Sequence, residues 1–190
     1  MVVENFVNQL SGGDFRQVGP EQVLGDIYQH IGYPDDGSCA YFKALVLCRL
    51  VYPGSKLKTT HYFNRHLNLD VSVYTIYRFL DELSSELKTR IEDLTFAHTT
   101  RISGGRIAVV FYDMTSLYFE ASSEDDFRVS GFSKDGKHSH PQILIGLLVT
   151  AQGYPVGYQL FEGNTAETKT LIPVLEAFQK RFSLQKTIAT

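Results

Sequence analysis

The chain has 190 residues, 43% of them hydrophobic, which is enough for a sizeable core and excludes a disordered tail. Its formal net charge of −3 excludes a uniformly basic coat for nucleic acid, although local basic blocks remain open. No run approaches the roughly 18 apolar residues of a membrane span and no leader peptide is visible, so we expect a cytoplasmic protein without membrane association.

The first half of the chain predicts helices. Apolar residues recur at three- and four-residue spacings in five segments, 21–31, 38–52, 55–66, 72–83 and 84–98. Several segments open on a serine that can cap a helix, and Pro53–Gly54 separates the second from the third. Cys39 and Cys48 lie nine residues apart without a CxxC motif, which predicts buried free thiols.

After Gly104–Gly105 the pattern changes to strands. Three strands are predicted at 106–119, 142–151 and 154–163, with Gln152–Gly153 as a tight turn. Residues 165–182 predict a helix that Asn164 or Thr165 caps, and Pro173 must lie in its first turns or bend it.

Residues 184–190 predict the opening of a fourth strand. The chain therefore predicts an α+β or α/β protein, with an all-helical region at 1–103 and a β-β-β-α-β unit at 104–190.

One acidic residue, Asp113, stands inside "RIAVVFYDMTSLYFE", which otherwise predicts a strand buried on both faces. Aspartate is a poor strand former and is seldom buried without a partner. Two interpretations remain open. Strand alternation turns Asp113 outward, or Thr115, Ser116 or a backbone amide satisfies it; alternatively, it binds a divalent metal ion together with further carboxylates, as in enzymes of phosphoryl transfer.

Other polar residues after the first strand give weaker signals. An acidic run predicts a solvated loop. It consists of Glu120, Glu124, Asp125 and Asp126. Asp135 lies in "SKDGK", which favours a turn, with phosphate contact by Lys134 or Lys137 as the alternative. His138 and His140 lack a third ligand, so we expect no metal site there.

The helical half contains a basic block. No acidic residue occurs from Gly37 to Leu69, where the cations and histidines are Lys43, Arg49, Lys56, Lys58, His61, Arg65 and His66. Such a block can neutralise phosphates. Residues 66–83 fit the second half of a helix-turn-helix with Tyr74, Tyr77 and Arg78 facing outward; alternatively, the tyrosines belong to the core and the cations to an ordinary wet face.

Several of these residues occur together in an order that resembles a known family. The pattern comprises Asp113-x-Thr115, the run "GFSKDG" at 131–136, Gln142, and Gly163-Asn164-Thr165 followed by Glu167. It is similar to the start of the catalytic domain of insertion-sequence DDE transposases of the IS four type, whose core has a ribonuclease-H-like fold. The segments "LCRLVYPGSKLKT" and "IYRFLDEL" resemble what precedes that core.

The resemblance implies that Asp113 is the first catalytic, metal-binding aspartate and that the complete enzyme uses Mg²⁺. The second aspartate is expected just after the fourth strand and the glutamate on a later helix, so we expect a truncated core without catalysis of its own. In the complete enzyme such a core cleaves DNA and joins strands.

The implied partner is double-stranded DNA at the element ends. We predict contacts to it by Lys56, Lys58, Arg65 and Arg78, and the family allows a homodimer or association with the full-length transposase. Two alternatives stay open: a non-catalytic DNA-binding protein that competes for element ends, and a small globular domain without retained activity.

Overall fold

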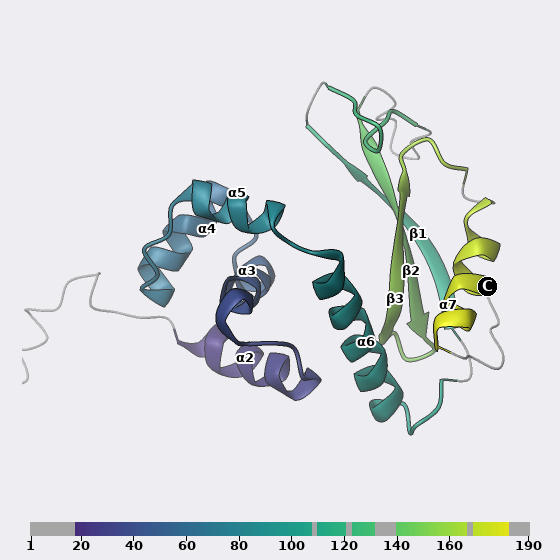
Figure 1. Ribbon diagram of the computed structural model, residues 1–190, viewed down its shortest axis with the longest axis horizontal. Coiled ribbons are helices and arrows are strands. Elements are labelled where there is room, and N and C mark those ends of the chain that lie inside the picture. Colours follow the sequence, from purple (N-terminus) through teal and green to yellow (C-terminus); the bar gives the residue numbers. More distant parts are fainter. Residues whose placement is uncertain (1–17, 108–109, 121–122, 132–139, 167–168, 183–190) are drawn as a thin grey trace, which may run out of the picture. The chain divides into compact units, whose positions relative to one another are not determined.

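Helices precede strands along the chain, as the sequence predicts. The computed structural model describes residues 18–107, 110–120, 123–131, 140–166 and 169–182 (Figure 1). Contacts divide the chain into two units, Met1–Ile91 and Glu92–Thr190, and the division falls inside helix α6 (Ser85–Ile102). The last turns of α6 therefore pack with the strands, so the division between units precedes the change of pattern at Gly104–Gly105.

The first unit consists of helices. They are α2 (Gly19–Ile31), the 3-10 turn η1 (Gly37–Cys39), α3 (Ala40–Val51), α4 (Lys56–Tyr62), the π-helical turn η2 (Phe63–Leu67) and α5 (Val73–Asp81). The serine caps predicted for α4 and α5 are present, because Ser55 Oγ accepts a hydrogen bond from the backbone of Lys58 and Ser72 Oγ from that of Thr75.

The core of the first unit joins α3, α4, η2 and α5. Its buried members are Ala44, Cys48, Tyr62, Phe63, Val71 and Ile76. Cys39 and Cys48 are both buried and free, which confirms the prediction for the two thiols. Burial raises the pKa of the Cys48 thiol, so this group behaves as a small apolar side chain.

The second unit contains an antiparallel sheet of three described strands in the order β1-β2-β3. The strands are β1 (Val110–Tyr118), β2 (Gln142–Thr150) and β3 (Pro155–Glu162). Gly153 has a φ of 85° in the turn between β2 and β3, as expected for the predicted hairpin. Helix α7 (Leu171–Phe182) follows, and the predicted fourth strand at 184–190 lies outside the described residues.

One face of the sheet is covered by α7 and by the end of α6. Val110, Leu148 and Val156 of the strands form a cluster with Val174 and Phe178 of α7. The rings of Phe96 in α6 and Phe182 in α7 stack at 4.0 Å between centroids. Arg181 of α7 also bridges to Glu92 and Asp93 of α6, so the two helices hold each other on this face.

Close packing on the covered face depends on two glycines. A Cβ atom on Gly157 would lie 1.9 Å from the Phe178 ring, and a Cβ atom on Gly146 would lie 2.4 Å from the Tyr112 hydroxyl. These rings therefore pass directly over the backbone of β3 and β2.

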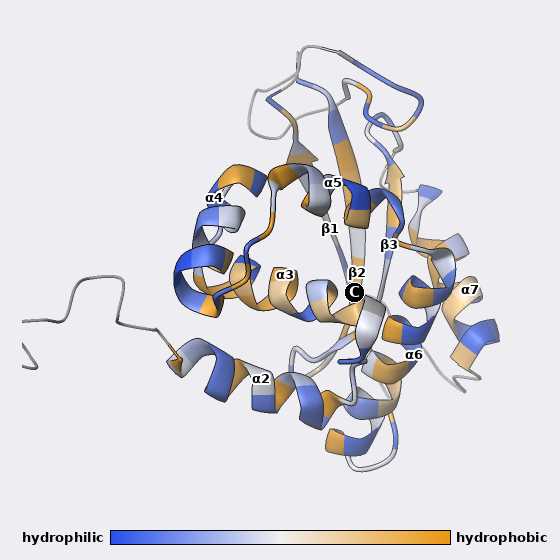
Figure 2. Ribbon diagram, turned by 60° about the vertical axis from the view of Figure 1, so that its left-hand side comes forward, coloured by the Kyte–Doolittle hydropathy of each residue, from blue (hydrophilic) through white to orange (hydrophobic). Residues whose placement is uncertain are grey.

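No described element covers the opposite face of the sheet, which we call the open face, and the expectation that β1 is buried on both faces was wrong. The strands are rich in hydrophobic residues (Figure 2), but alternate residues of β1 are exposed. Phe111 is 38%, Leu117 45% and Leu147 41% exposed. Apolar composition predicted burial that the described elements do not provide, because a strand sequence does not specify what covers its second face.

The predicted cap of α7 was also wrong, because the helix begins at Leu171 and not after Asn164 or Thr165. Thr165 instead donates its backbone N–H to Glu162 in a turn. Starting at Leu171 places Pro173 in the first turn, where the missing N–H has no helical partner to lose. The described part of the chain has no helix of the length and hydrophobicity that crossing a membrane requires.

Candidate functional site

Asp113 lies near the middle of β1, on the open face of the sheet. Its Cα partner on β2 is Leu147, and its neighbours along the same face are Phe111 and Thr115. The side chain is exposed, and it makes no hydrogen bond or ion pair within the described residues. Water can therefore solvate the carboxylate, and the first of the two interpretations, strand alternation turning the residue outward, describes its position.

The described residues do not form a Mg²⁺ site around Asp113. Among them, no three His, Cys, Asp or Glu side chains lie close enough together to hold a metal ion. Mg²⁺ requires several oxygen ligands in octahedral geometry, which one carboxylate does not supply. Residues 188–190, beside which the second carboxylate was expected, lie outside the described residues, so the catalytic role of Asp113 stays a prediction.

The residues on either side of Asp113 are anchored on the covered face. The Tyr112 hydroxyl donates to Thr170 Oγ1 at 2.9 Å, and the Thr170 hydroxyl lies 2.9 Å from Met114 Sδ. Thr170 is 1% exposed and directly precedes α7. The backbone that carries Asp113 is thus held from behind at both neighbouring positions.

Three residues of the sequence pattern meet at one end of the sheet. The Gln142 side-chain amide donates to the carbonyl of Gly163 at 2.6 Å, and Gln142 is 0% exposed. A Cβ atom on Gly131 would lie 2.1 Å from that same carbonyl oxygen. Gln142, Gly131 and Gly163 therefore join the start of β2, the end of β3 and the segment before residue 132.

Where the structure describes it, the acidic run after β1 is a solvated loop, as predicted. Glu120, Glu124, Asp125 and Asp126 are exposed. Asp125 accepts hydrogen bonds from the backbone of Arg128 and Phe127 and from the Arg128 side chain, and these bonds lower the pKa of its carboxyl. The pKa of Glu124 is lowered by hydrogen bonds from Ser130. The predictions for Lys134, Asp135, Lys137 and His138 concern residues that are not described.

Part of the basic block forms a stripe along α4 and η2. We define this basic stripe as Lys56, Lys58, His61 and Arg65; the last three share one helical face and are exposed, whereas Lys56 is half-buried. None of the four side chains makes a hydrogen bond or ion pair within the described residues. The charges of Lys56, Lys58 and Arg65 are therefore available to a partner.

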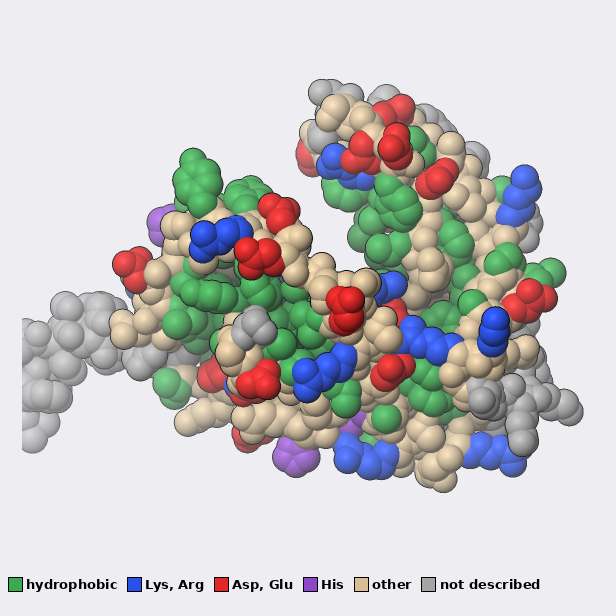
Figure 3. All heavy atoms as spheres, viewed as in Figure 1, with side chains coloured by type: hydrophobic (Ala, Val, Ile, Leu, Met, Phe, Trp, Pro, Cys, Tyr) green, Lys and Arg blue, Asp and Glu red, His purple; other side chains and the backbone are tan. Residues whose placement is uncertain are grey.

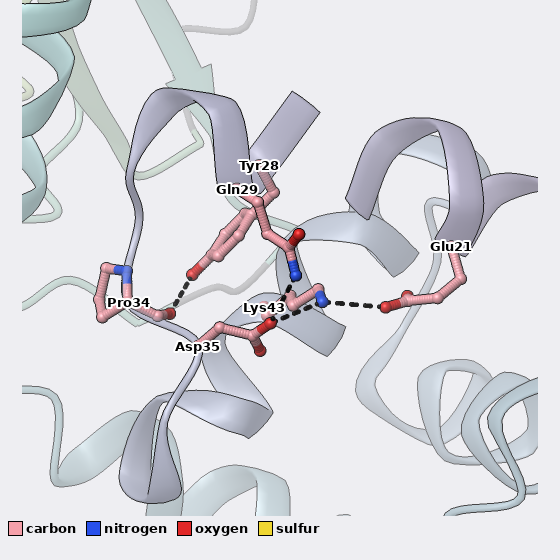
Figure 4. A network of polar contacts seen from close by, with 6 residues as sticks. All are labelled: Glu21, Tyr28, Gln29, Pro34, Asp35 and Lys43. Atoms are coloured by element: carbon pink, nitrogen blue, oxygen red, sulfur yellow. Dashed lines mark hydrogen bonds and ion pairs between the residues drawn. The ribbon is translucent and has the colours of Figure 1, made fainter. Parts of the chain in front are cut away.

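Lys43 and Arg49 belong to the block in sequence but have structural roles. Lys43 Nζ lies 3.1 Å from Glu21 and 2.8 Å from Asp35 (Figure 4), and its side chain is only 13% exposed. Burial would lower the pKa of Lys43, but hydrogen bonds to Asp35 and Glu21 outweigh it and raise the pKa. Arg49 Nη1 donates to the carbonyl of Gly54 at 2.5 Å.

Helix α5 presents the three outward-facing residues that the sequence predicts. Tyr74 is 80% and Tyr77 49% exposed, and the Arg78 side chain is exposed without a hydrogen bond or ion pair in the described part of the chain. Between η2 and α5, Asn68 adopts a φ of 54°, a left-handed conformation that asparagine tolerates well. Residues 68–72 connect η2 to α5, and the helix-turn-helix stays a prediction.

Sequence reasoning did not find a cavity of about 420 Å³ in the first unit. Its lining includes Val18, Glu21, Lys43, His66 and Leu69, from α2, α3, η2 and their flanks. No sequence pattern signals it, because these residues come together only through helix packing.

Comparisons with known proteins do not establish a family. No family model and no curated protein matches the chain. Among solved structures, the Mos1 transposase paired-end complex with the left transposon end is similar at 12% identity and a TM-score of 0.27, over 99% of this chain and 68% of that one. The Mos1 mariner paired-end complex with Mn is similar at 14% identity and a TM-score of 0.23, over 95% and 60%. Similarity at this level does not establish a shared fold.

Proposed function

We propose that the first unit binds double-stranded DNA through the basic stripe and Arg78. The observation that carries this proposal is the row of unpaired cations along α4 and η2, in a segment without acidic residues from Gly37 to Leu69. Cations that are already satisfied, such as Lys43, stabilise the unit itself. The basic stripe has no such partner in the described residues, and a phosphate backbone would supply one.

We further propose that the chain belongs to an insertion-sequence DDE transposase, with Asp113 as the first metal-binding carboxylate and element ends as its DNA. The support is the sequence pattern from Asp113 to Glu167. Mg²⁺ would polarise a phosphodiester when bound by a full set of carboxylates. This chain's described residues contribute one of them, so DNA cleavage by this chain alone is not expected.

Salt-dependent binding tests the DNA proposal. The affinity for a duplex should fall steeply with salt, with a slope of about 0.9 per neutralised phosphate in a plot of log K against log salt. The triple variant Lys56→Ala, Lys58→Ala, Arg65→Ala should reduce that slope by about 2.7 if each side chain contacts one phosphate.

The matched control removes the same charge from exposed cations of the second unit. Its substitutions are Arg106→Ala, Lys169→Ala and Lys180→Ala. The control should retain the wild-type slope. Equal loss in both triple variants would show a diffuse charge effect, and an unchanged slope in the first variant would place the phosphate contacts elsewhere.

A non-catalytic DNA-binding protein that competes for element ends is the second candidate. The observation that favours it is that no group of three His, Cys, Asp or Glu side chains among the described residues is arranged to hold a metal ion. A nicking assay on supercoiled DNA with Mg²⁺ distinguishes the two candidates. Nicking above background that Asp113→Asn abolishes supports catalysis, whereas DNA binding with no nicking supports the competitor.

A further inference from the structure

Two large aromatic side chains stand in solvent on α5. Tyr74 is 80% and Tyr77 49% exposed, whereas Ile76 between them is 2% exposed. Helical geometry places Tyr74, Tyr77 and Arg78 on one face, because residues three and four apart are neighbours on a helix. Hydrophobic, basic and acidic side chains lie beside one another over α5 in Figure 3.

The position of these tyrosines is fixed by the core behind them. Phe63 of η2 is 0% exposed, and it shares a cluster with Val71 and Ile76, which lie just before and within α5. The Ser72 cap holds the first turn of α5. The helix is therefore anchored against η2, and its outward face is presented to a partner with little conformational freedom left to lose.

The charged residues of α5 lie in its last turn and directly after it. Arg78 is in the last turn, and Asp81 and Glu82 are exposed at the end of the helix. Phosphates are repelled by the two carboxylates. Tyr74, in the first turn, is therefore the outward-facing residue farthest along the helix from this repulsion.

The geometry points to α5 as the element that determines DNA sequence preference, with Tyr74 and Tyr77 contacting base edges while the basic stripe holds the backbone. This inference rests on the proposed DNA binding. A phenol ring makes apolar contact with the thymine methyl group, and its hydroxyl both donates to and accepts from base edges in the major groove. Contacts to phosphates contribute affinity without sequence information, so the two surfaces have separable effects.

The test begins with selection of a preferred duplex by the full chain from a library of duplexes with a randomised centre. Affinities for the selected duplex and for a scrambled one are then measured over a range of salt concentrations. Tyr74→Ala and Tyr77→Ala should each reduce the ratio of these affinities by about fivefold or more, at an unchanged salt slope. The triple variant of the basic stripe should show the reverse, a smaller slope at a retained ratio.

Tyr154→Ala is the matched control, because Tyr154 is 44% exposed in the hairpin of the second unit. It should leave both ratio and slope unchanged, and circular dichroism checks that each variant is folded. Tyr74→Phe keeps the ring, so it should lose only the contribution of the hydroxyl.

Other outcomes would overturn the inference. Two results would show that α5 does not determine sequence preference while leaving the DNA proposal intact. One is a wild-type chain that binds DNA without sequence preference, and the other is an unchanged ratio of affinities for the selected and scrambled duplexes in both alanine variants. If the alanine variants differ from the wild type in sedimentation coefficient but not in the ratio of affinities, the tyrosines belong to an interface between protein chains. Absence of any DNA binding by the wild type overturns both proposals.

Discussion

Asp113 is a residue that the sheet would be more stable without. Asp113 and Thr115 lie two positions apart on the open face of β1, opposite Leu147 and Ile145 of β2 respectively. Their surroundings are thus similar, and each is exposed. Strand preferences span about 1 kcal/mol, with threonine near the favourable end and aspartate near the unfavourable end. Asp113→Thr should therefore raise the free energy of unfolding by up to about 1 kcal/mol.

The matched control is the reverse substitution on the same face. Thr115→Asp should lower the free energy of unfolding by about the same amount. The exchange Asp113→Thr with Thr115→Asp moves the carboxylate by about 6.8 Å along the strand. Its net effect should lie within about 0.5 kcal/mol of zero, apart from coupling between neighbouring sites.

Urea unfolding followed by circular dichroism measures these differences, since the chain has no tryptophan for fluorescence. Hydrogen exchange of the β1–β2 amides assigns the change to the sheet and not to the first unit. A loss of more than about 0.5 kcal/mol in Asp113→Thr would refute the reasoning, because the carboxylate would then have a stabilising partner in the folded chain. In that case Asp113 could not be interpreted as a residue that is retained for function at the expense of stability.

Further expectations concern the packing of the second unit and the ion pairs of the first. Gly157→Ala should destabilise the sheet by about 1–3 kcal/mol in urea unfolding, because the new Cβ atom meets the Phe178 ring, whereas Gly19→Ala, which meets nothing within 4 Å, should not. The hydrogen bond from Lys43 is the main cause that lowers the pKa of Asp35 in the folded chain. The ionised Asp35 therefore stabilises the fold fully above about pH 4, and this contribution is lost as the pH falls through the lowered pKa. Lys43→Met should make the free energy of unfolding fall less steeply as the pH is lowered below about 4. An unchanged pH dependence would show that other carboxylates control the stability in acid.

Local signals were sufficient for much of the fold. Ser55 and Ser72 act as caps where the sequence places them, because a serine side chain satisfies a backbone N–H in its own turn. Gly153 forms the predicted hairpin turn because its left-handed φ is a local requirement. Features of this kind depend on a few consecutive residues and need no knowledge of the partner elements.

Predictions from the sequence were wrong where segments distant in the chain determine the local structure. Thr165 looked like a helix cap, but the start of α7 depends on Pro173 and on Thr170, which is held by Tyr112 from another part of the chain. Burial of Phe111 was predicted from its hydrophobicity, yet the open face has no described cover. In the same way, the basic block could not separate Lys43 from its neighbours, because its partners come from α2 and from the segment before η1.

Unsatisfied polar residues on anchored elements carry the functional argument in both units. Asp125 and Lys43 have hydrogen-bond and ion-pair partners that account for their presence without any ligand. The side chains of Asp113 and Arg78 have no such partners among the described residues, although the strand and helix that carry them are firmly packed. A charged side chain on a flexible segment loses conformational entropy when it binds a partner. A charged side chain on a well-packed helix or strand loses less, because its backbone is already held in one position. If phosphates are that partner, Arg78→Ala should weaken binding to every duplex and reduce the salt slope by about 0.9. Retention of the full slope would assign Arg78 to base contacts alongside the tyrosines, and its loss would then lower the sequence preference instead.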